Sequence, residues 1–138
     1  GENDLDLPLA VLEELLRWDG CDGVINLGIL GRRIFVKRLT KAAAVADPDL
    51  DPDFLDLARQ TLQAFEETYV QRIAELCAQY GKPVYGVSLL REGTDRTVYN
   101  VAGCDFNGVF FETPERAVQA FAKMVAYHRF RNHEQMPS

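Results

Sequence analysis

The sequence predicts an α/β protein in which helices cover both faces of a mostly parallel sheet, a three-layer, doubly wound architecture. Three observations lead to this prediction. Short apolar runs rich in Val, Ile, Phe and Tyr alternate along the chain with longer segments whose apolar residues recur every three or four positions. The short runs lack a polar alternation, which is typical of parallel strands buried on both faces. Glycine or proline separates the two kinds of segment at most of their joints.

The size and composition indicate one globular domain. A chain of 138 residues is long enough for one core and too short for two, so we treat residues 1–138 as a single domain. Hydrophobic residues make up 47% and charged residues 26% of the chain, and no apolar run is long enough to cross a membrane. No secretory signal opens the sequence, and three widely spaced cysteines fit reduced thiols in the cytoplasm.

The charge balance argues against a nucleic-acid partner. The chain has 21 acidic and 15 basic residues, a net charge of −6, which disfavours binding to a phosphate backbone. Five basic residues do cluster, and we expect them to form a solvated loop or helix face: Arg32, Arg33, Lys37, Arg38 and Lys41. Neither a nucleic-acid nor a membrane partner is therefore expected.

The first elements follow from local signals. Asn3–Leu7 is the first predicted strand, and a helix is expected from Pro8 to the region of Gly20. One side of that helix is apolar through Leu9, Leu12, Leu15 and Leu16. The continuous apolar run Gly23–Leu27 is the second predicted strand.

A less regular segment and a long helix come next. We assign residues 32–53 to an insertion, in which the acidic, proline-containing stretch 47–53 should break any helix and stay exposed. Asp53 is expected to cap a long helix that Gly81 and Pro83 end. The apolar stripe of this helix consists of Leu62, Phe65, Tyr69, Ile73, Leu76 and Tyr80.

Two more strands and a closing helix complete the prediction. Pro83–Leu89 is the third strand, followed by a polar loop over 90–100 and a short helix or turn near 101–104. Gly108–Phe111 is the fourth strand. Thr113 and Pro114 are then suited to capping and starting a helix. One face of that helix is expected to carry Ala117, Val118, Phe121, Ala122, Val125 and His128.

The best candidate site is the loop NLGILG, residues 26–31, at the carboxyl end of the second strand. Open parallel sheets bind ligands at such ends, so the loops beginning at Leu7, Asn26, Ser88 and Glu112 are the candidate binding positions. The backbone N–H groups around Gly28 and Gly31 can cradle a phosphate, with Arg32 or Arg33 adding positive charge. Two glycines after a strand also fit an ordinary turn, because the loop lacks the complete phosphate-loop and dinucleotide-binding patterns.

No side chain is assigned a catalytic role, and no metal site is assigned. We expect His128 to be packed and hydrogen-bonded and His133 to be solvated, since neither has an identifiable nucleophile partner. The acids in 47–53 are interrupted by two prolines and lack the glycine and the final glutamate of a calcium loop. Cys104, beside Asp105, is expected to be a structural thiol and not a reactive one.

Four segments, in order from residue 3 to about residue 130, resemble a known family. NDLDL is similar to its Asn-Pro-x-Asp-Leu opening, and CDGV with NLGILG is similar to its Val-Asp-Ala-Val strand and small-residue exit loop. GKPVYGVSLL resembles its Lys-Pro-Val strand, and GVFFETPERAVQAFAKMVAYHRF resembles its closing strand and helix. The family is the second flavodoxin-like, CoA-ligase domain of nucleoside-diphosphate-forming acyl-CoA synthetases, relatives of succinyl-CoA synthetase.

The resemblance implies a flavodoxin-like domain that helps interconvert acyl-CoA, phosphate and a nucleoside diphosphate with the free acid, CoA and a nucleoside triphosphate. In that family a phosphorylated histidine carries the phosphoryl group, and helix N-termini stabilise it. Neither His128 nor His133 matches the family's histidine setting. The resemblance therefore implies a part of a larger protein, acting with companion CoA-binding, phosphohistidine-bearing and nucleotide-grasp domains or subunits. CoA and ATP or ADP with Mg would belong to the full-length enzyme, with no cofactor bound tightly here.

Two departures from the family pattern favour an alternative. Leu7 runs directly into Pro8, which lacks an N–H, where family members have a glycine-containing connection. The region 32–80 is also longer than a single crossover helix. The alternative is a noncatalytic ligand-binding or assembly module that retains the fold, and self-association into a homo-oligomer is left open. A signal-receiver domain fits less well, because Val87, Ser88 and Leu89 supply no phosphorylatable aspartate.

Overall fold

The computed structural model describes residues 6–27, 32–88 and 98–134, which form an α/β fold with four helices and a four-stranded sheet. The strands are β1 (Val24–Leu27), β2 (Val84–Val87), β3 (Val98–Tyr99) and β4 (Gly108–Phe111), in the spatial order β1-β2-β4-β3. β1, β2 and β4 are parallel, and β3 pairs antiparallel with β4 at one edge. The α/β class and the mostly parallel sheet are therefore confirmed.

The first helix, α1 (Asp6–Arg17), begins earlier than predicted. Asp6 and Leu7 are helical, so the predicted first strand is wrong at these two positions, and residues 3–5 lie outside the described part of the chain. Pro8 is the third residue of α1, and a proline is tolerated there because the first N–H groups of a helix have no helical partner. Leu12 and Leu16 are buried as expected, whereas Leu15 is exposed.

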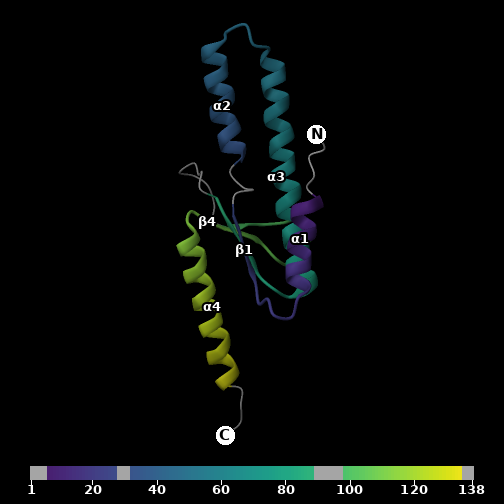
Figure 1. Ribbon diagram of the computed structural model, residues 1–138, viewed down its shortest axis with the longest axis vertical. Helices are drawn as coiled ribbons and strands as arrows, with labels where there is room; N and C mark the ends of the chain where they lie inside the picture. The colour runs from purple at the N-terminus through teal and green to yellow at the C-terminus, as the bar shows by residue number, and fades with distance from the viewer. Residues whose placement is uncertain (1–5, 28–31, 89–97, 135–138) are drawn as a thin grey trace.

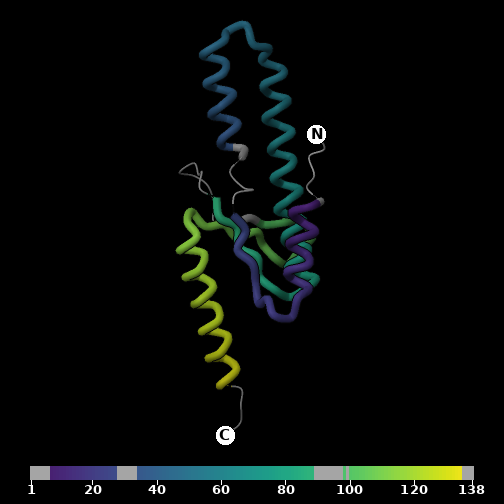
Figure 2. The backbone as a smooth tube through the Cα atoms, viewed as in Figure 1, coloured from purple at the N-terminus to yellow at the C-terminus, as the bar shows by residue number. Residues whose placement is uncertain are grey.

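Between β1 and β2 the chain forms a helical hairpin of α2 (Arg32–Ala46) and α3 (Pro52–Tyr80), which extends away from the sheet (Figures 1 and 2). The sequence did not predict α2, which fills most of the segment 32–53 assigned to an insertion. The turn between the helices is mostly exposed, as expected. Asp51, and not Asp53, caps α3: its Oδ1 accepts the N–H of Asp53 at 2.9 Å. Proline favours the first helical position, so the cap is the residue before it.

The end of α3 is the one predicted. Gly81 follows its last residue with a φ of 64°, in the left-handed region that glycine adopts without a steric penalty. Its N–H donates to the carbonyl oxygen of Cys77 at 2.9 Å, which satisfies one of the free carbonyls of the last turn. Pro83 then leads into β2.

The principal core lies where α1 and α3 meet β1 and β2. It contains Leu12, Leu16, Tyr69, Ile73, Leu76, Cys77 and Val84. The next residue of β2, Tyr85, packs instead against the last helix, α4 (Pro114–Glu134), with ring centroids 4.5 Å apart from Phe121. Successive strand side chains point in opposite directions, so β2 serves two sets of helices. In Figure 1 the strands lie between α4 and the pair α1 and α3.

The start of α4 is as predicted, but most of its expected apolar face is not buried. Ala117 is buried and Phe121 is half-buried, whereas Val118, Val125 and His128 are exposed. The expectation of a packed His128 is therefore wrong. The physical reason is length: 21 helical residues extend about 31 Å, whereas a four-residue strand extends about 13 Å. The second half of α4 consequently projects beyond the sheet (Figure 1).

The connection from β2 to β4 contains one unpredicted strand. β3 is only two residues long, too short to show a periodic pattern. The turn expected near 101–104 is confirmed, with Cys104 N–H donating to the carbonyl oxygen of Val101 at 3.3 Å and a positive φ at Gly103. Leu89, the last residue of the predicted third strand, lies with residues 90–97 outside the described part of the chain.

Candidate functional site

The three parallel strands end together at one edge of the sheet. The register aligns Leu27 with Val87, and Val87 with Phe111, so the segments that follow β1, β2 and β4 begin side by side. α2 starts soon after β1, and α4 starts at Pro114 directly after β4. Because ligands of open parallel sheets bind at this edge, the carboxyl edge is the candidate functional site.

The predicted phosphate loop begins in β1, which ends at this edge, but its key residues are not described. Gly28 and Gly31 lie outside the described residues, and Arg32 is described only as the first residue of α2, without its side chain. The structure does place Asn26 and Leu27 in β1, and α2 begins at Arg32. Phosphate binding by these residues therefore stays a prediction.

The N-terminus of α4 is already occupied by its own side chains. Pro114 has no N–H, and the N–H of Arg116 donates to Thr113 Oγ1 at 3.3 Å. The Glu115 carboxylate accepts hydrogen bonds from its own N–H and from the Thr113 hydroxyl, which lower the pKa of the Glu115 carboxyl. A phosphate at this terminus would have to displace both side chains and approach a negative charge. This end of the edge is consequently the weaker anion site.

The cation nearest this terminus is paired as well. The Arg116 guanidinium lies 2.8 Å from Oε2 of Glu112, a residue that precedes α4. Both side chains are exposed, and such surface pairs contribute about 0–1 kcal/mol. The pair is thus weak enough to open for an incoming anion, although Glu112 and Glu115 keep the local charge balance negative.

A partly buried hydrogen bond joins α3 to β1 beneath the edge. Asn26 Nδ2 donates to the hydroxyl of Tyr69 at 2.6 Å, and Tyr69 is 1% exposed. Burial raises the pKa of the Tyr69 hydroxyl, and the bond from Asn26 partly opposes that effect. Tyr69 is therefore a neutral hydroxyl that positions Asn26, and not a base. The sequence predicted the elements that carry both residues but not their contact. The available signal was the pair of tyrosine hydroxyls in the otherwise apolar α3 stripe, at Tyr69 and Tyr80.

Ser88, which begins the loop after β2, is also held at this edge. It is 8% exposed, and its N–H donates to the carbonyl oxygen of Phe111 at 2.9 Å. This bond extends the contact between β2 and β4 by one position beyond the paired residues. The first residue of the β2 loop is thereby fixed relative to the start of α4.

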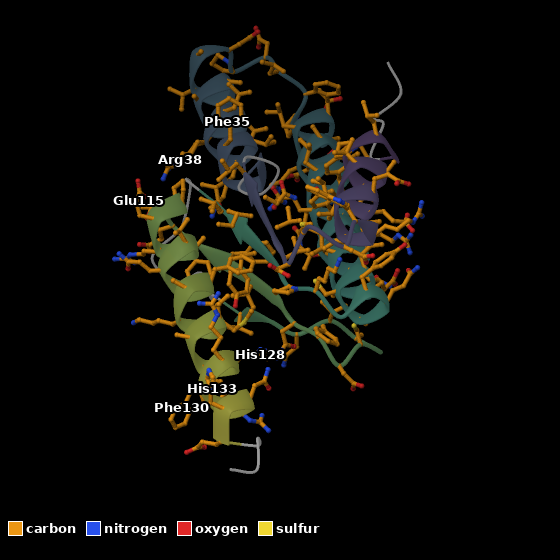
Figure 3. All side chains as sticks on the ribbon, turned by 60° about the horizontal axis from the view of Figure 1, so that its bottom comes forward. Phe35, Arg38, Glu115, His128, Phe130 and His133 are labelled. Atoms are coloured by element: carbon orange, nitrogen blue, oxygen red, sulfur yellow. The ribbon has the colours of Figure 1, made fainter. Side chains whose placement is uncertain are left out.

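The histidines lie at the other end of α4 from this site. Figure 3 shows Glu115 at one end of the helix and His128 and His133 at the other. Thirteen helical positions separate Glu115 from His128, about 20 Å. Both histidines are exposed, and His128 Nδ1 lies 3.3 Å from Asn132 Nδ2. The structure therefore brings neither histidine to the carboxyl edge.

The other candidate residues have local structural roles. In the turn 47–53, Asp47 Oδ1 accepts the N–H of Asp49 at 3.1 Å. Among the described residues there is no group of three metal-binding side chains, and no helix is long and apolar enough to cross a bilayer. Cys77 is buried, which raises the pKa of its thiol, and the half-buried Cys104 Sγ lies 3.5 Å from the carbonyl oxygen of Ala74.

Comparisons with family models, curated proteins and solved structures gave no match. The fold and the carboxyl edge define the class of the protein: an α/β protein with a parallel sheet of three strands and an antiparallel edge strand.

Proposed function

We propose that the chain is a flavodoxin-like, three-layer, doubly wound CoA-ligase domain of an ADP-forming acyl-CoA synthetase-like protein. In this proposal it helps form the phosphoryl-transfer site for acyl-CoA and acid interconversion, and it acts only with companion CoA-binding, phosphohistidine-bearing and nucleotide-grasp domains or subunits. The observation that carries the proposal is the common edge at which β1, β2 and β4 end and both α2 and α4 begin. Two helix N-termini at one edge favour a transferred phosphoryl group.

The charge distribution favours the β1–α2 side as the phosphoryl contact. α2 carries five basic residues and no acidic one over Arg32–Ala46, whereas the first turn of α4 carries Glu115. Since the positive end of a helix dipole is worth about half an elementary charge, the neighbouring side chains decide which terminus attracts an anion. Gly28, Gly31 and Arg32 are therefore the proposed phosphate contacts, and α4 supplies the opposite wall.

Backbone NMR of the isolated chain tests the site. Inorganic phosphate, CoA and Mg-ADP are titrated separately while the amide signals of residues 26–33 and 113–116 are followed. The proposal expects larger shifts in 26–33 than in 113–116. Arg32→Ala should weaken the response, and Arg59→Ala should not, because Arg59 pairs with Asp56 at 3.0 Å on the hairpin. No response to any of the three compounds would remove the phosphate site.

An activity assay tests the dependence on companions. The isolated chain is expected to show no acid- and CoA-dependent nucleotide turnover, because the proposed mechanism takes its phosphorylated histidine from a companion. Robust turnover by the chain alone would contradict the proposal, even if the phosphate site were confirmed by NMR.

A second function is favoured by the state of the α4 N-terminus. Because Pro114, Glu115 and Thr113 leave it few free donors, a noncatalytic ligand-binding or assembly module that retains the fold is the alternative. This alternative predicts that the titration shifts the amide signals of neither 26–33 nor 113–116. The hairpin of α2 and α3 would then serve protein contacts.

A further inference from the structure

The α2–α3 hairpin exposes a cluster of large apolar side chains. Phe35 and Leu39 of α2 are 55% and 54% exposed, and Phe54 and Leu57 of α3 are 62% and 63% exposed. We call the surface that these four residues mark the hairpin face. A patch of this kind on a projecting hairpin is typical of a protein contact.

The four side chains lie on one side of the hairpin. On each helix, one line of residues faces the other helix of the hairpin, and the exposed apolar residues form a second line, the stripe. At 100° per residue, each stripe is rotated by about 100° about its helix axis from the facing line, in the same sense on both helices. In an antiparallel pair, the same sense of rotation means the same side. The half-buried residues that mark the facing line are Val36, Thr40 and Ala43 on α2 and Leu55, Ala58 and Leu62 on α3.

The angle between the two apolar faces of each helix indicates how many helices cover the hairpin face. A helix in a square four-helix bundle contacts its two neighbours at about 90°, whereas in a three-helix bundle the contacts are about 60° apart. The angle of about 100°, which follows from the positions of these residues along ideal helices, fits the square arrangement. A second antiparallel helix pair, and not a single helix in the groove, therefore matches the hairpin face.

We propose that a second copy of this chain covers the hairpin face, so that two hairpins form a four-helix bundle. The same chain supplies a helix pair of the required width. The stripes carry no charged residue: between and beyond the large side chains they continue with Ala42, Ala46, Thr61 and Ala64, all exposed. Thr61 Oγ1 donates to the carbonyl oxygen of Leu57 at 2.8 Å, so its hydroxyl is already satisfied within α3. An uncharged face can pair with an identical face without like charges in contact.

The order of large and small residues favours an antiparallel arrangement, in which the two hairpins pack side by side and point in opposite directions. On α2 the large residues lie in the first half and the alanines in the second, and on α3 the large residues also come first. When two copies pack with opposite directions, the large half of each stripe meets the small half of its counterpart. This arrangement also keeps the two sheets at opposite ends of the bundle, because each hairpin extends away from its own sheet (Figure 2).

The area of the hairpin face sets the expected strength. A 15-residue helix is about 22 Å long and two helices are about 20 Å wide, so two copies would together bury about 900 Å². This is near the lower limit for a specific interface, about 1,000 Å². We therefore expect a weak dimer in reversible exchange with monomer.

Sedimentation velocity of the full chain from about 5 μM to about 500 μM tests the proposal, with circular dichroism to verify folding. Leu39→Asp should weaken the dimer at least tenfold. Val45→Asp is the matched control: Val45 is 77% exposed on the same helix but points away from the hairpin face. A monomer throughout the concentration range would overturn the proposal and leave the face to another protein. A dimer that tolerates Leu39→Asp would overturn it as well.

A cross-link tests the antiparallel arrangement of the two hairpins. In the antiparallel dimer, α2 packs on the α2 of the second copy, and Leu39 lies near the twofold axis that relates the copies. The cysteines of two Leu39→Cys chains should therefore form a disulfide under mild oxidation. Wild type, with the native Cys21, Cys77 and Cys104, serves as the control. If α2 packed on the partner's α3, the two introduced thiols would lie on a diagonal of the bundle and would not join, and that result would overturn the arrangement.

Discussion

Removing the hydroxyl of Tyr69 should loosen the fold directly beneath the carboxyl edge. Asn26 Nδ2 donates to this hydroxyl at 2.6 Å, and Tyr69 is 1% exposed. A neutral hydrogen bond contributes about 0.5–1.5 kcal/mol net, whereas a buried group left without a partner costs about 1–3 kcal/mol. Because Asn26 is half-buried and can reach water, we expect Tyr69→Phe to lower the free energy of unfolding by about 1 kcal/mol.

Removing the other partner of this hydrogen bond should lower the free energy of unfolding by more. Asn26→Ala leaves the buried hydroxyl of Tyr69 without its donor, so we expect a loss of about 2 kcal/mol. The double variant should lose about 1 kcal/mol less than the sum of the two single losses, since both remove the same bond. For a chain of 138 residues, each 1 kcal/mol corresponds to about 3 °C in Tm.

Urea unfolding followed by circular dichroism measures all four proteins of this double-mutant cycle. Tyr85→Phe, at a half-buried tyrosine on β2, is a matched control for loss of a hydroxyl elsewhere in the fold. Strictly additive losses at Asn26 and Tyr69 would refute the reasoning, because they would show no coupling between the two side chains.

Three further predictions concern stability. Leu16→Ala should lower the free energy of unfolding by about 2–5 kcal/mol, because Leu16 is 0% exposed in the core, and Leu15→Ala at an exposed position should lower it much less by the same urea assay. Gly81→Ala should cost about 1 kcal/mol in thermal melts, because its φ is 64° and no atom within 4 Å adds a clash, and Gly81→Asn should cost less. Burial raises the folded-state pKa of Tyr69, so stability should be constant below the unfolded pKa of about 10 and fall as the pH rises above it, with a smaller fall in Tyr69→Phe.

Each of these has an outcome that contradicts it. Equal losses for the two leucine variants would mean that Leu16 is not a core residue. An unchanged melting temperature for Gly81→Ala would show that the α3 end adapts without strain. If wild type and Tyr69→Phe lost stability in parallel between pH 9 and 11, Tyr69 would not be the titrating group. The fall in stability would then come from other tyrosines, such as Tyr85, because burial also raises the pKa of Tyr85.

Elements with a local chemical signal were predicted well. Thr113 and Pro114 start α4, Gly81 ends α3, and the strands around Val24–Leu27, Val84–Val87 and Gly108–Phe111 occur where apolar runs indicated them. Caps and short apolar runs act over a few residues, so the sequence displays them directly. Asp51 in place of Asp53 is an error of two positions within the same signal.

Elements without such a signal were missed. α2 lacks an acidic first turn and a strong apolar stripe on the side facing α3, so residues 32–53 looked irregular. β3 has two residues, and they pair with residues of β4 that lie eleven and nine positions further along the chain. The first strand was wrong at Asp6 and Leu7 because Pro8 was taken as a helix start, although it sits equally well inside the first turn.

For the candidate site too, some features were predicted from the sequence and others were not. The sequence identified the loops after β1, β2 and β4 as the places to inspect, because parallel strands share one carboxyl edge. It did not indicate that Thr113 and Glu115 fill the α4 terminus, or that Asn26 binds Tyr69. That last contact joins residues 43 positions apart, and no local pattern specifies such a pair.

By itself, then, the sequence determined the α/β class, most helix and strand positions, and the location of the edge where function is proposed. The tertiary structure alone decided which apolar stripes are covered. α4 is longer than the sheet it packs on, and the hairpin of α2 and α3 extends past the core, so stripes that look alike in sequence end in different surroundings. Burial depends on which elements reach one another in space, and periodicity records only that a face exists.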